Sequence, residues 1–301
     1  MSFRSSDPTP ETGVGAGVAA KARNGLHPSS SARADGVRFE RSKRWGAWYV
    51  AEHELRRVPG YKWSMLATAI GSPLLYLLAF GVGLATLIKT GSSAGIDGVT
   101  YAQFVIPAFL CAGTLGTAAE EFTFGVLLGF KWNETYLGMN AGPITPRQIA
   151  GGHILFTILR MTATSGIFLI IAMAFGAIRF PEGLLVLPAA ILGGLAFGIP
   201  IAAYSTTIRE DRGQFAVIGR TVVLPMTLFS GTVFPITQLP IWLQWIGWIS
   251  PLWHSTQLAR DAAYGHVEPG WLTLVHLVVL IGLIAVGAFV QVRLTTRRLN
   301  R

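Results

Sequence analysis

The sequence predicts an all-α integral membrane protein with six transmembrane helices, an N-terminal amphipathic interfacial helix and a re-entrant helical hairpin before the last span. Hydrophobic residues make up 51% of the 301 residues and charged residues only 13%, about half the charge of a soluble protein. The apolar residues also gather into runs longer than the roughly 20 residues that cross a bilayer. Only helices or closed barrels span a membrane, and runs of this length are helices.

Residues 1–40 precede the apolar runs and are expected to form a disordered cytoplasmic tail. They are rich in Ser, Gly, Ala and Pro, and they contain no apolar stretch of the kind found in a signal peptide. Residues 41–301 are expected to form one transmembrane domain.

The segment from Arg41 to Pro59 has the pattern of a basic amphipathic helix. Apolar residues recur at steps of three and four, and basic residues lie off that stripe. A Trp-rich apolar face of this kind suits the cytoplasmic headgroup layer of a membrane. The alternative is an ordinary surface helix that packs on a partner. The apolar stripe comprises Trp45, Trp48, Ala51, Leu55 and Val58.

Six apolar stretches are expected to span the membrane. They cover residues 63–88, 104–128, 149–178, 183–208, 214–234 and 271–292. The segment 235–265 is also apolar, but prolines cut it into pieces too short to cross, and it is rich in Trp. We therefore expect two short helices there that dip into the outer leaflet and return.

The placement of Lys and Arg predicts that both termini are cytoplasmic. Of the 24 basic residues, eleven precede Trp63 and four lie in the last nine residues. In this orientation the outside retains only Lys89, Arg179 and Arg260, as the positive-inside rule requires. The expected location is the plasma (inner) membrane. Because the basic residues lie beside the spans, they give no support to nucleic-acid binding.

The most informative charged residues inside the predicted spans are two acids and one base. Glu120 and Glu121 lie in the second span and Arg160 lies in the third. A lone charge near the bilayer centre costs at least ~2.5 kcal/mol, so one glutamate, preferably Glu121, is expected to pair with Arg160. The alternative is that the helices begin elsewhere and all three residues lie in the interface.

The outer segment between the fifth and sixth spans carries candidate gate residues. They are Trp242, Trp245, Trp253, His254 and Arg260. A polar gate or a substrate rim is one interpretation, and interfacial anchoring with a local ion pair is the simpler one.

The polar segment 131–152 between the second and third spans is expected to lie in the cytoplasm. Residues 133–142 can form a short helix there, stopped by Gly142-Pro143. A short helix lying between two spans is suited to act as a lever.

This segment, with Thr135, Met139 and Pro143-Ile144, resembles the coupling-helix region of the type-2 ABC transporter permeases. The similarity is greatest to the branch of nodulation-factor lipo-oligosaccharide exporters and antibiotic-efflux permeases. Residues 121–125 (EFTFG) and the motifs SGTVFP and SPLWH within 230–254 resemble the same branch.

The resemblance implies a six-helix subunit that dimerises around the substrate path, with a separate ATPase docked on the coupling helix. The second permease would be another copy or a related subunit, and membrane lipids would surround both. The implied ATPase contacts are Asn133, Glu134, Thr135, Tyr136, Leu137, Met139 and Pro143.

The chain itself is not expected to be an enzyme. Gly-Lys does not occur in it, so there is no Walker A loop, and ATP-Mg is expected on the partner ATPase. The six histidines show no metal-ligand spacing, so no metal site is expected.

The sequence thus favours the permease subunit of an ATP-driven exporter of amphipathic substrates, either drugs and antibiotics or lipid-linked oligosaccharides and glycolipids. Two other classes are weighed against it. A membrane-embedded enzyme needs clustered acids or nucleophiles, for which Glu120 and Glu121 are the only candidates. An ion-driven transporter favours internal repeats, and no convincing repeat is present.

Overall fold

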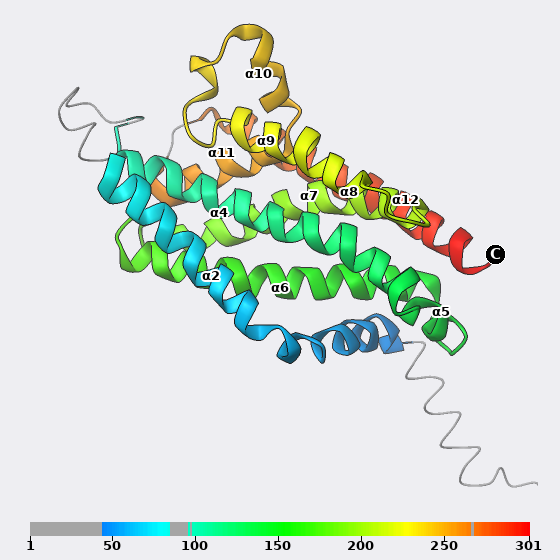
Figure 1. Ribbon diagram of the computed structural model, residues 1–301. Coiled ribbons are helices and arrows are strands. Elements are labelled where there is room, and N and C mark those ends of the chain that lie inside the picture. Colours follow the sequence, from blue (N-terminus) through cyan, green and yellow to red (C-terminus); the bar gives the residue numbers. More distant parts are fainter. Residues whose placement is uncertain (1–43, 85–95, 97, 266–267) are drawn as a thin grey trace, which may run out of the picture. The chain divides into compact units, whose positions relative to one another are not determined.

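The regular structure of this chain is helical. The computed structural model describes residues 44–84, 96, 98–265 and 268–301, and within them the only extended pairing is an isolated bridge between Ile96 and Val99. Long helices lie side by side, and shorter helices lie at their ends (Figure 1). The expected tail over residues 1–40 lies outside the described residues.

The described chain begins with a helix over residues 44–55, here called the N-terminal helix, which packs on α6 (Pro146–Ala174). Pro59 lies in the following 3-10 turn, η1 (Val58–Gly60), where its missing N–H breaks the helical bonding. Ala51 is fully buried, whereas Trp45 and Trp48 are exposed. The prediction of a single apolar stripe facing the membrane was therefore wrong in part, because its small residue faces the protein and its indoles face outward.

The first span is helical as far as it is described. α2 (Lys62–Tyr76) continues directly into the wider π-helical turns of η2 (Leu77–Leu84). The last four residues of the predicted span 63–88 lie outside the described residues.

The second span is one continuous helix over residues 101–132, longer than the predicted 104–128. It starts at a capping box in which Thr100 and Gln103 bond each other's backbone N–H groups. Its segments are α4 (Tyr101–Glu120), η3 (Glu121–Gly125) and η4 (Leu128–Trp132), of which the last two are π-helical.

The predicted cytoplasmic helix is present but shorter than expected. α5 covers Thr135–Asn140 rather than 133–142. Glu134 has a left-handed backbone with φ 50°, which prevents the helix from extending back to Asn133. After the turn that contains Pro143, a second capping box, formed by Thr145 and Gln148, starts α6.

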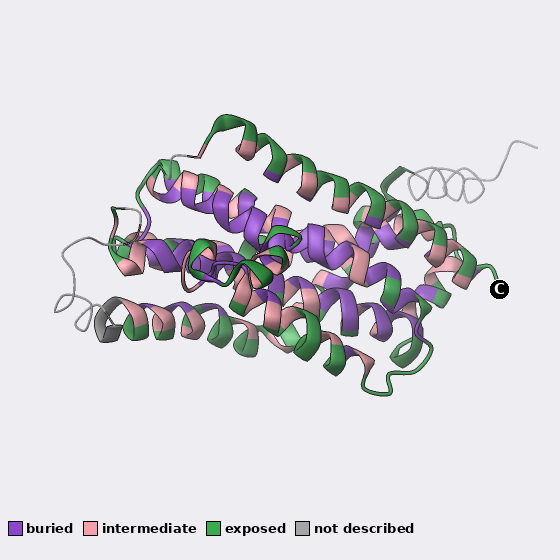
Figure 2. Ribbon diagram, turned by 90° about the horizontal axis from the view of Figure 1, so that it is seen from above, coloured by how far each residue is buried: buried purple, intermediate pink, exposed green. Residues whose placement is uncertain are grey.

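α7 (Val186–Thr207) is the central helix. It follows the short turn η5 (Glu182–Leu185) and packs against α4, α11 (Pro251–Tyr264) and α12 (Gly270–Leu299). Figure 2 shows that α4 and α7 are largely buried, whereas much of α2 and α12 is exposed. Gly198 permits the close packing of α7, because a Cβ at this position would collide with the ring of Phe122.

The fifth predicted span, residues 214–234, is shorter in the structure. α8 (Gln214–Ile218), η6 (Gly219–Val223) and α9 (Leu224–Phe229) form an apolar helix that ends at Phe229. Its 16 residues rise only about 24 Å, less than the ~30 Å of a bilayer core. The chain then turns at Gly231, whose φ of 71° is left-handed, towards Pro235. Five described helices are long and apolar enough to span, so the count of six is not confirmed.

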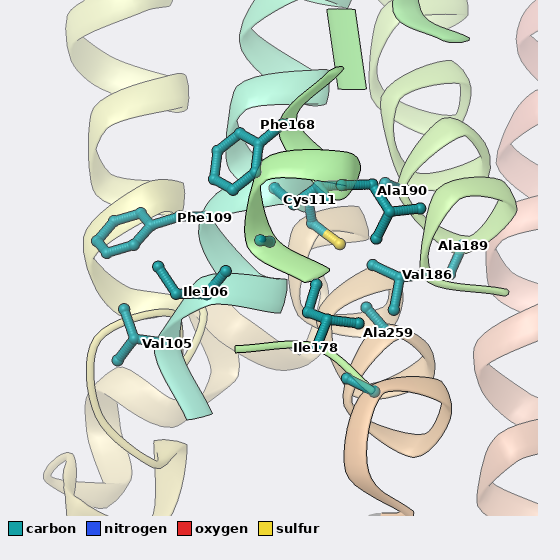
Figure 3. Close-up of a cluster of buried hydrophobic side chains, with 14 of the residues drawn as sticks. Val105, Ile106, Phe109, Cys111, Phe168, Ile178, Val186, Ala189, Ala190 and Ala259 are labelled. Atoms are coloured by element: carbon teal, nitrogen blue, oxygen red, sulfur yellow. The ribbon is translucent and has the colours of Figure 1, made fainter. Parts of the chain in front are cut away.

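Two short helices separate this segment from the last span, as the prolines predicted. α10 (Ile241–Trp248) follows the turn η7 (Ile236–Gln238), and α11 leads towards α12. One core cluster joins α11 to α4, α6 and α7 (Figure 3), and Cys111 lies within it with its thiol 3.6 Å from the carbonyl of Ser255.

Side-chain contacts identify which helix ends lie together. Asn140 of α5 donates to the carbonyl of Leu299 at 3.3 Å, and Arg298 donates to the carbonyls of Thr206 and Ile208 at 2.7 and 2.8 Å. The α5 end of the bundle therefore contains the C-terminal ends of α7 and α12 (Figure 1).

Candidate functional site

Two carboxylates and one guanidinium meet inside the bundle, where the sequence predicted one pair. Arg160 of α6 lies 3.0 Å from Glu120 (Nη2–Oε2) and also pairs with Glu121 through Nη1. The Glu120 side chain is 61% exposed, whereas those of Glu121 and Arg160 are only 10% and 13% exposed. The backbone changes from α- to π-helical between the two glutamates, a departure that is frequent at functional sites.

A second polar cluster, which the sequence did not predict, lies beside this ion pair. Its members are Glu54 of the N-terminal helix, Tyr136 of α5 and His153 of α6, and all three are buried. The Tyr136 hydroxyl donates to Glu54 Oε1 at 3.2 Å, and His153 Nδ1 lies 3.0 Å from Glu54 Oε2. We call Glu54, Tyr136 and His153 the buried triad.

The buried triad is connected to the ion pair through the second span. His153 Nε2 lies 3.2 Å from the backbone carbonyl of Glu121, the residue whose carboxylate pairs with Arg160. A continuous path of polar contacts therefore runs from α5, through the N-terminal helix and α6, to the interior of the bundle. Glu54, Tyr136 and His153 all have polar partners, whereas the buried Nε of Arg160 has none. The paired part of such a network is rigid, because breaking any of its contacts is costly.

Tyr136 is held in place by the shape of the second span. Gly129 lies against the phenol ring, and a Cβ there would collide with it. Phe130 contacts the same ring edge-to-face, with centroids 5.0 Å apart. Burial raises the pKa of Tyr136 well above its ordinary value, and the neighbouring Glu54 carboxylate raises it further. The phenol therefore stays protonated and remains a donor to Glu54.

Sequence signals for the buried triad were weak but present. Gly46, Val50 and Glu54 occur at steps of four, which places the acid on the same face as two residues that pack on α6. An acid in line with small apolar residues is a sign of a buried partner. The partners themselves come from segments about 80 and 100 residues further along, and one sequence cannot pair them.

A cavity of about 450 Å³ lies between α2, the second span and α6. The ion pair residues line it, together with Glu54 of the triad and aromatic side chains such as Tyr61 and Trp132. Its size falls within the range of ordinary ligand pockets.

The expected ATPase contacts around α5 differ in their exposure. Asn133, Glu134, Leu137 and Pro143 are exposed, whereas Tyr136 is buried. The side chains of Thr135 and Met139 are partly buried between these extremes. α5 therefore has an outward face that can receive a partner and an inward residue that joins the buried triad.

The expected gate residues also divide into two groups. Trp242 and Trp245 of α10 are exposed, whereas Trp253, His254 and Arg260 of α11 are buried. None of the five lines the cavity beside the ion pair.

The buried gate residues make contacts that hold segments together. Arg260 donates to the carbonyls of Phe104 and Gly231 at 3.3 and 2.8 Å, and its guanidinium lies 3.7 Å from the centre of the Phe104 ring. His254 Nδ1 lies 2.6 Å from His276 Nδ1, which connects α11 to α12. These contacts bind the α10–α11 segment to the starts of the second and last spans.

Comparison with known proteins gives a family match over most of the described chain. A family model described as ABC-2 type transporter matches residues 50–264. Nodulation protein J of Rhizobium leguminosarum bv. viciae is 28% identical over 250 residues, covering 82% of this chain and 93% of that protein. Nodulation protein J of Rhizobium meliloti (strain 1021) is 26% identical, covering 82% and 90%. A probable multidrug ABC transporter permease, YbhR of Escherichia coli (strain K12), is 31% identical over 124 residues, covering 40% and 32%.

Proposed function

Because this chain belongs to the ABC-2 type transporter family, a family of multi-pass membrane permeases, we propose that it is the transmembrane subunit of an ATP-driven exporter. It moves an amphipathic substrate, a drug or antibiotic or a lipid-linked oligosaccharide or glycolipid, out across the plasma membrane. A separate ATPase subunit supplies the energy, and a second permease, either another copy or a related chain, completes the pathway.

The observation that carries this proposal is the position of α5. It lies between two long spans, has an exposed outer face, and inserts Tyr136 into the buried triad. Force applied to the outer face of α5 reaches Glu54 of the N-terminal helix, and through it His153 of α6, by way of the Tyr136 side chain. Packed elements with two discrete arrangements, rather than continuous deformation, transmit such movements.

The ion pair extends this route into the membrane. His153 contacts both Glu54 and the backbone of Glu121, and Glu121 in turn pairs with Arg160. A shift of α5 relative to α6 therefore changes the contacts that hold the second and third spans together. In this mechanism, closure of the ATPase dimer pushes α5 and moves the walls of the cavity.

The distribution of charge supports a cytoplasmic position for α5. The α5 end of the bundle carries Lys131, Arg209, Arg212, Arg297 and Arg298. This enrichment is what the positive-inside rule requires of a cytoplasmic surface. The N-terminal helix packs on the first turns of α6, and its exposed Trp45 and Trp48 suit contact with lipid headgroups.

Co-purification tests the proposal directly. The chain, expressed with an ATPase encoded beside its gene, is expected to form a complex that hydrolyses ATP and responds to amphiphiles. Leu137→Asp, on the exposed face of α5, is expected to abolish association while insertion into the membrane persists. Leu184→Asp is the matched control, because Leu184 is an exposed leucine in another short turn, at the far end of α6. Failure of any ATPase to associate with the unmodified chain contradicts the proposal.

A further inference from the structure

Nine residues with hydroxyl groups line the cavity. On α2 the residues Ser64, Thr68, Ser72 and Tyr76 all line it. Their spacing of four places them in one column along a single helix face. Hydroxyls from the second and third spans line the opposite side, namely Thr114, Thr117, Thr164 and Ser165.

Several of these hydroxyls already donate a hydrogen bond to a backbone carbonyl of their own helix. Thr68 donates to the carbonyl of Ser64 at 3.0 Å, Thr117 to that of Gly113 at 3.1 Å, and Thr164 to that of Arg160 at 3.0 Å. A hydroxyl that donates to its own helix keeps two lone pairs as acceptors. These three threonines therefore present acceptors rather than donors to the cavity.

The proline in α2 also leaves one backbone carbonyl beside the cavity without its usual donor. Pro73 lies inside α2, and both Pro73 and Ala69 line the cavity. A proline within a helix has no N–H to give to the carbonyl four residues earlier, so the carbonyl of Ala69 lacks its helical donor.

The charged residues that line the cavity are Glu54, Glu120, Glu121, Arg57 and Arg160, so carboxylates outnumber guanidiniums by one. Arg160 is largely buried and is shared between two carboxylates, whereas the side chain of Glu120 is 61% exposed. Glu120 lies twelve residues before Trp132, the end of the second span, which corresponds to about 18 Å along the helix. Two carboxylates share the Arg160 guanidinium, so Glu120 can take a second cationic partner on its exposed side, and such pairing is favourable within a span.

We propose that this cavity binds the primary ammonium head of an amphiphile, with Glu120 as its counter-ion and the column of hydroxyl and carbonyl acceptors around it. An ammonium group carries three donors and no acceptor, which complements this lining. The aromatic side chains Tyr61, Phe124 and Trp132 also line the cavity and suit a cation that has an apolar tail. The assignment of this ligand as an exported substrate rests on the function proposed above, but its binding does not.

Binding of three twelve-carbon probes tests the inference. Radiolabelled dodecylammonium, dodecanol and dodecanoate are titrated against the protein in phosphatidylcholine nanodiscs, without ATPase or nucleotide, and empty nanodiscs give the background. Saturable binding is expected for the ammonium probe and not for the other two. Equal saturable binding of the alcohol, or stronger binding of the carboxylate, overturns the proposal.

Variants then locate the site. Glu120→Gln is expected to weaken ammonium binding about tenfold, between the values typical of exposed and buried charge pairs, and it leaves Glu121 with Arg160. Glu182→Gln, in the exposed turn η5 outside the cavity, is the matched control and is expected to change nothing. Thr117→Val removes one acceptor at nearly constant volume and is expected to weaken binding severalfold. Full retention of ammonium binding in Glu120→Gln contradicts the site.

Nanodiscs with added phosphatidylethanolamine distinguish the source of the ammonium. Competition by this lipid supports the site with a lipid headgroup as its occupant, whereas no competition supports the site with a free amphiphile. Because no ATPase is present, ammonium binding without ATPase association leaves this inference intact while removing the proposed export function. If an ATPase associates but the protein shows no preference for the ammonium probe, the proposed export function stands and this inference fails.

Discussion

The hydroxyl of Tyr136 is expected to determine how tightly α5 is held to the bundle. Tyr136→Phe removes only the oxygen that donates to Glu54 at 3.2 Å, and it keeps the ring against Gly129 and Phe130. Both partners of the lost bond are buried, at 4% and 6% exposure. A hydrogen bond to a charged group contributes roughly 1.5–3 kcal/mol, which corresponds to about a 10- to 100-fold change in an equilibrium constant.

Hydrogen exchange of α5 measures this equilibrium. In the complex with its ATPase, the peptide that covers residues 135–140 is expected to exchange about 10- to 100-fold faster in Tyr136→Phe, because local opening limits exchange. Export per ATP hydrolysed is expected to fall while association with the ATPase persists, since the outward face of α5 is unchanged. Tyr204→Phe is the matched control, because Tyr204 is an exposed tyrosine of α7.

A double-mutant cycle shows whether the effect passes through Glu54. In a Glu54→Met background, Tyr136→Phe is expected to have a much smaller effect on exchange, because the acceptor is already gone. Unchanged exchange in the single variant, or an equal effect in both backgrounds, would refute the mechanical role of this contact.

Three further results are expected. The raised pKa of Tyr136 means that the folded state keeps a proton that the unfolded state loses above pH 10, its ordinary pKa. This contribution to stability is present below pH 10 and is lost as the pH rises towards the folded pKa. Unfolding midpoints should therefore fall more steeply between pH 9 and 11 in the native chain than in Tyr136→Phe, and parallel curves would count against this reasoning. Gly129→Ala places a Cβ against the Tyr136 ring and is expected to lower the unfolding midpoint and export, whereas Gly138→Ala, which meets open space on the same helix pair, is expected to be neutral or mildly stabilising; equal effects would contradict the packing argument. Arg260→Lys retains the charge but cannot reach the carbonyls of Phe104 and Gly231 together, so a loss of about 2–4 kcal/mol of unfolding free energy is expected, and full stability of this variant would show that the contacts are dispensable.

The membrane-spanning helices were predictable because the length and apolar composition of a local segment determine whether it can cross a bilayer. A run of apolar residues longer than the bilayer is thick must be a helix, whatever it packs against. The starts at Thr100 and Thr145 also follow local rules, since both are capping boxes. The fifth span was overestimated because apolar composition continued to Phe234, although the helix ends at Phe229.

The site was predictable only where charge made it conspicuous. Glu121 and Arg160 stand out because ionisable residues are rare in spans, and the depth of the two helices was enough to bring them together. The sequence predicted that one glutamate would pair with Arg160, whereas in the structure both do. The burial of Glu54 was not predicted, because this residue lies among basic residues in an amphipathic segment, where a charged side chain is expected on the surface.

The start of α5 depends on a single backbone conformation. The left-handed φ of Glu134 makes the helix begin at Thr135, and glutamate has no strong preference for that conformation. Composition alone therefore supported the longer helix over 133–142.

The accessibility of α5 tests the central claim most directly. Cys111 is the only cysteine in the chain, so Leu137→Cys in a Cys111→Ala background carries one thiol, on the exposed face of α5. A membrane-impermeant maleimide is expected to label it in inside-out vesicles and not in intact cells, and co-expression of the ATPase is expected to block the label. Labelling from outside intact cells, or labelling from the inside that the ATPase leaves unchanged, would contradict the account.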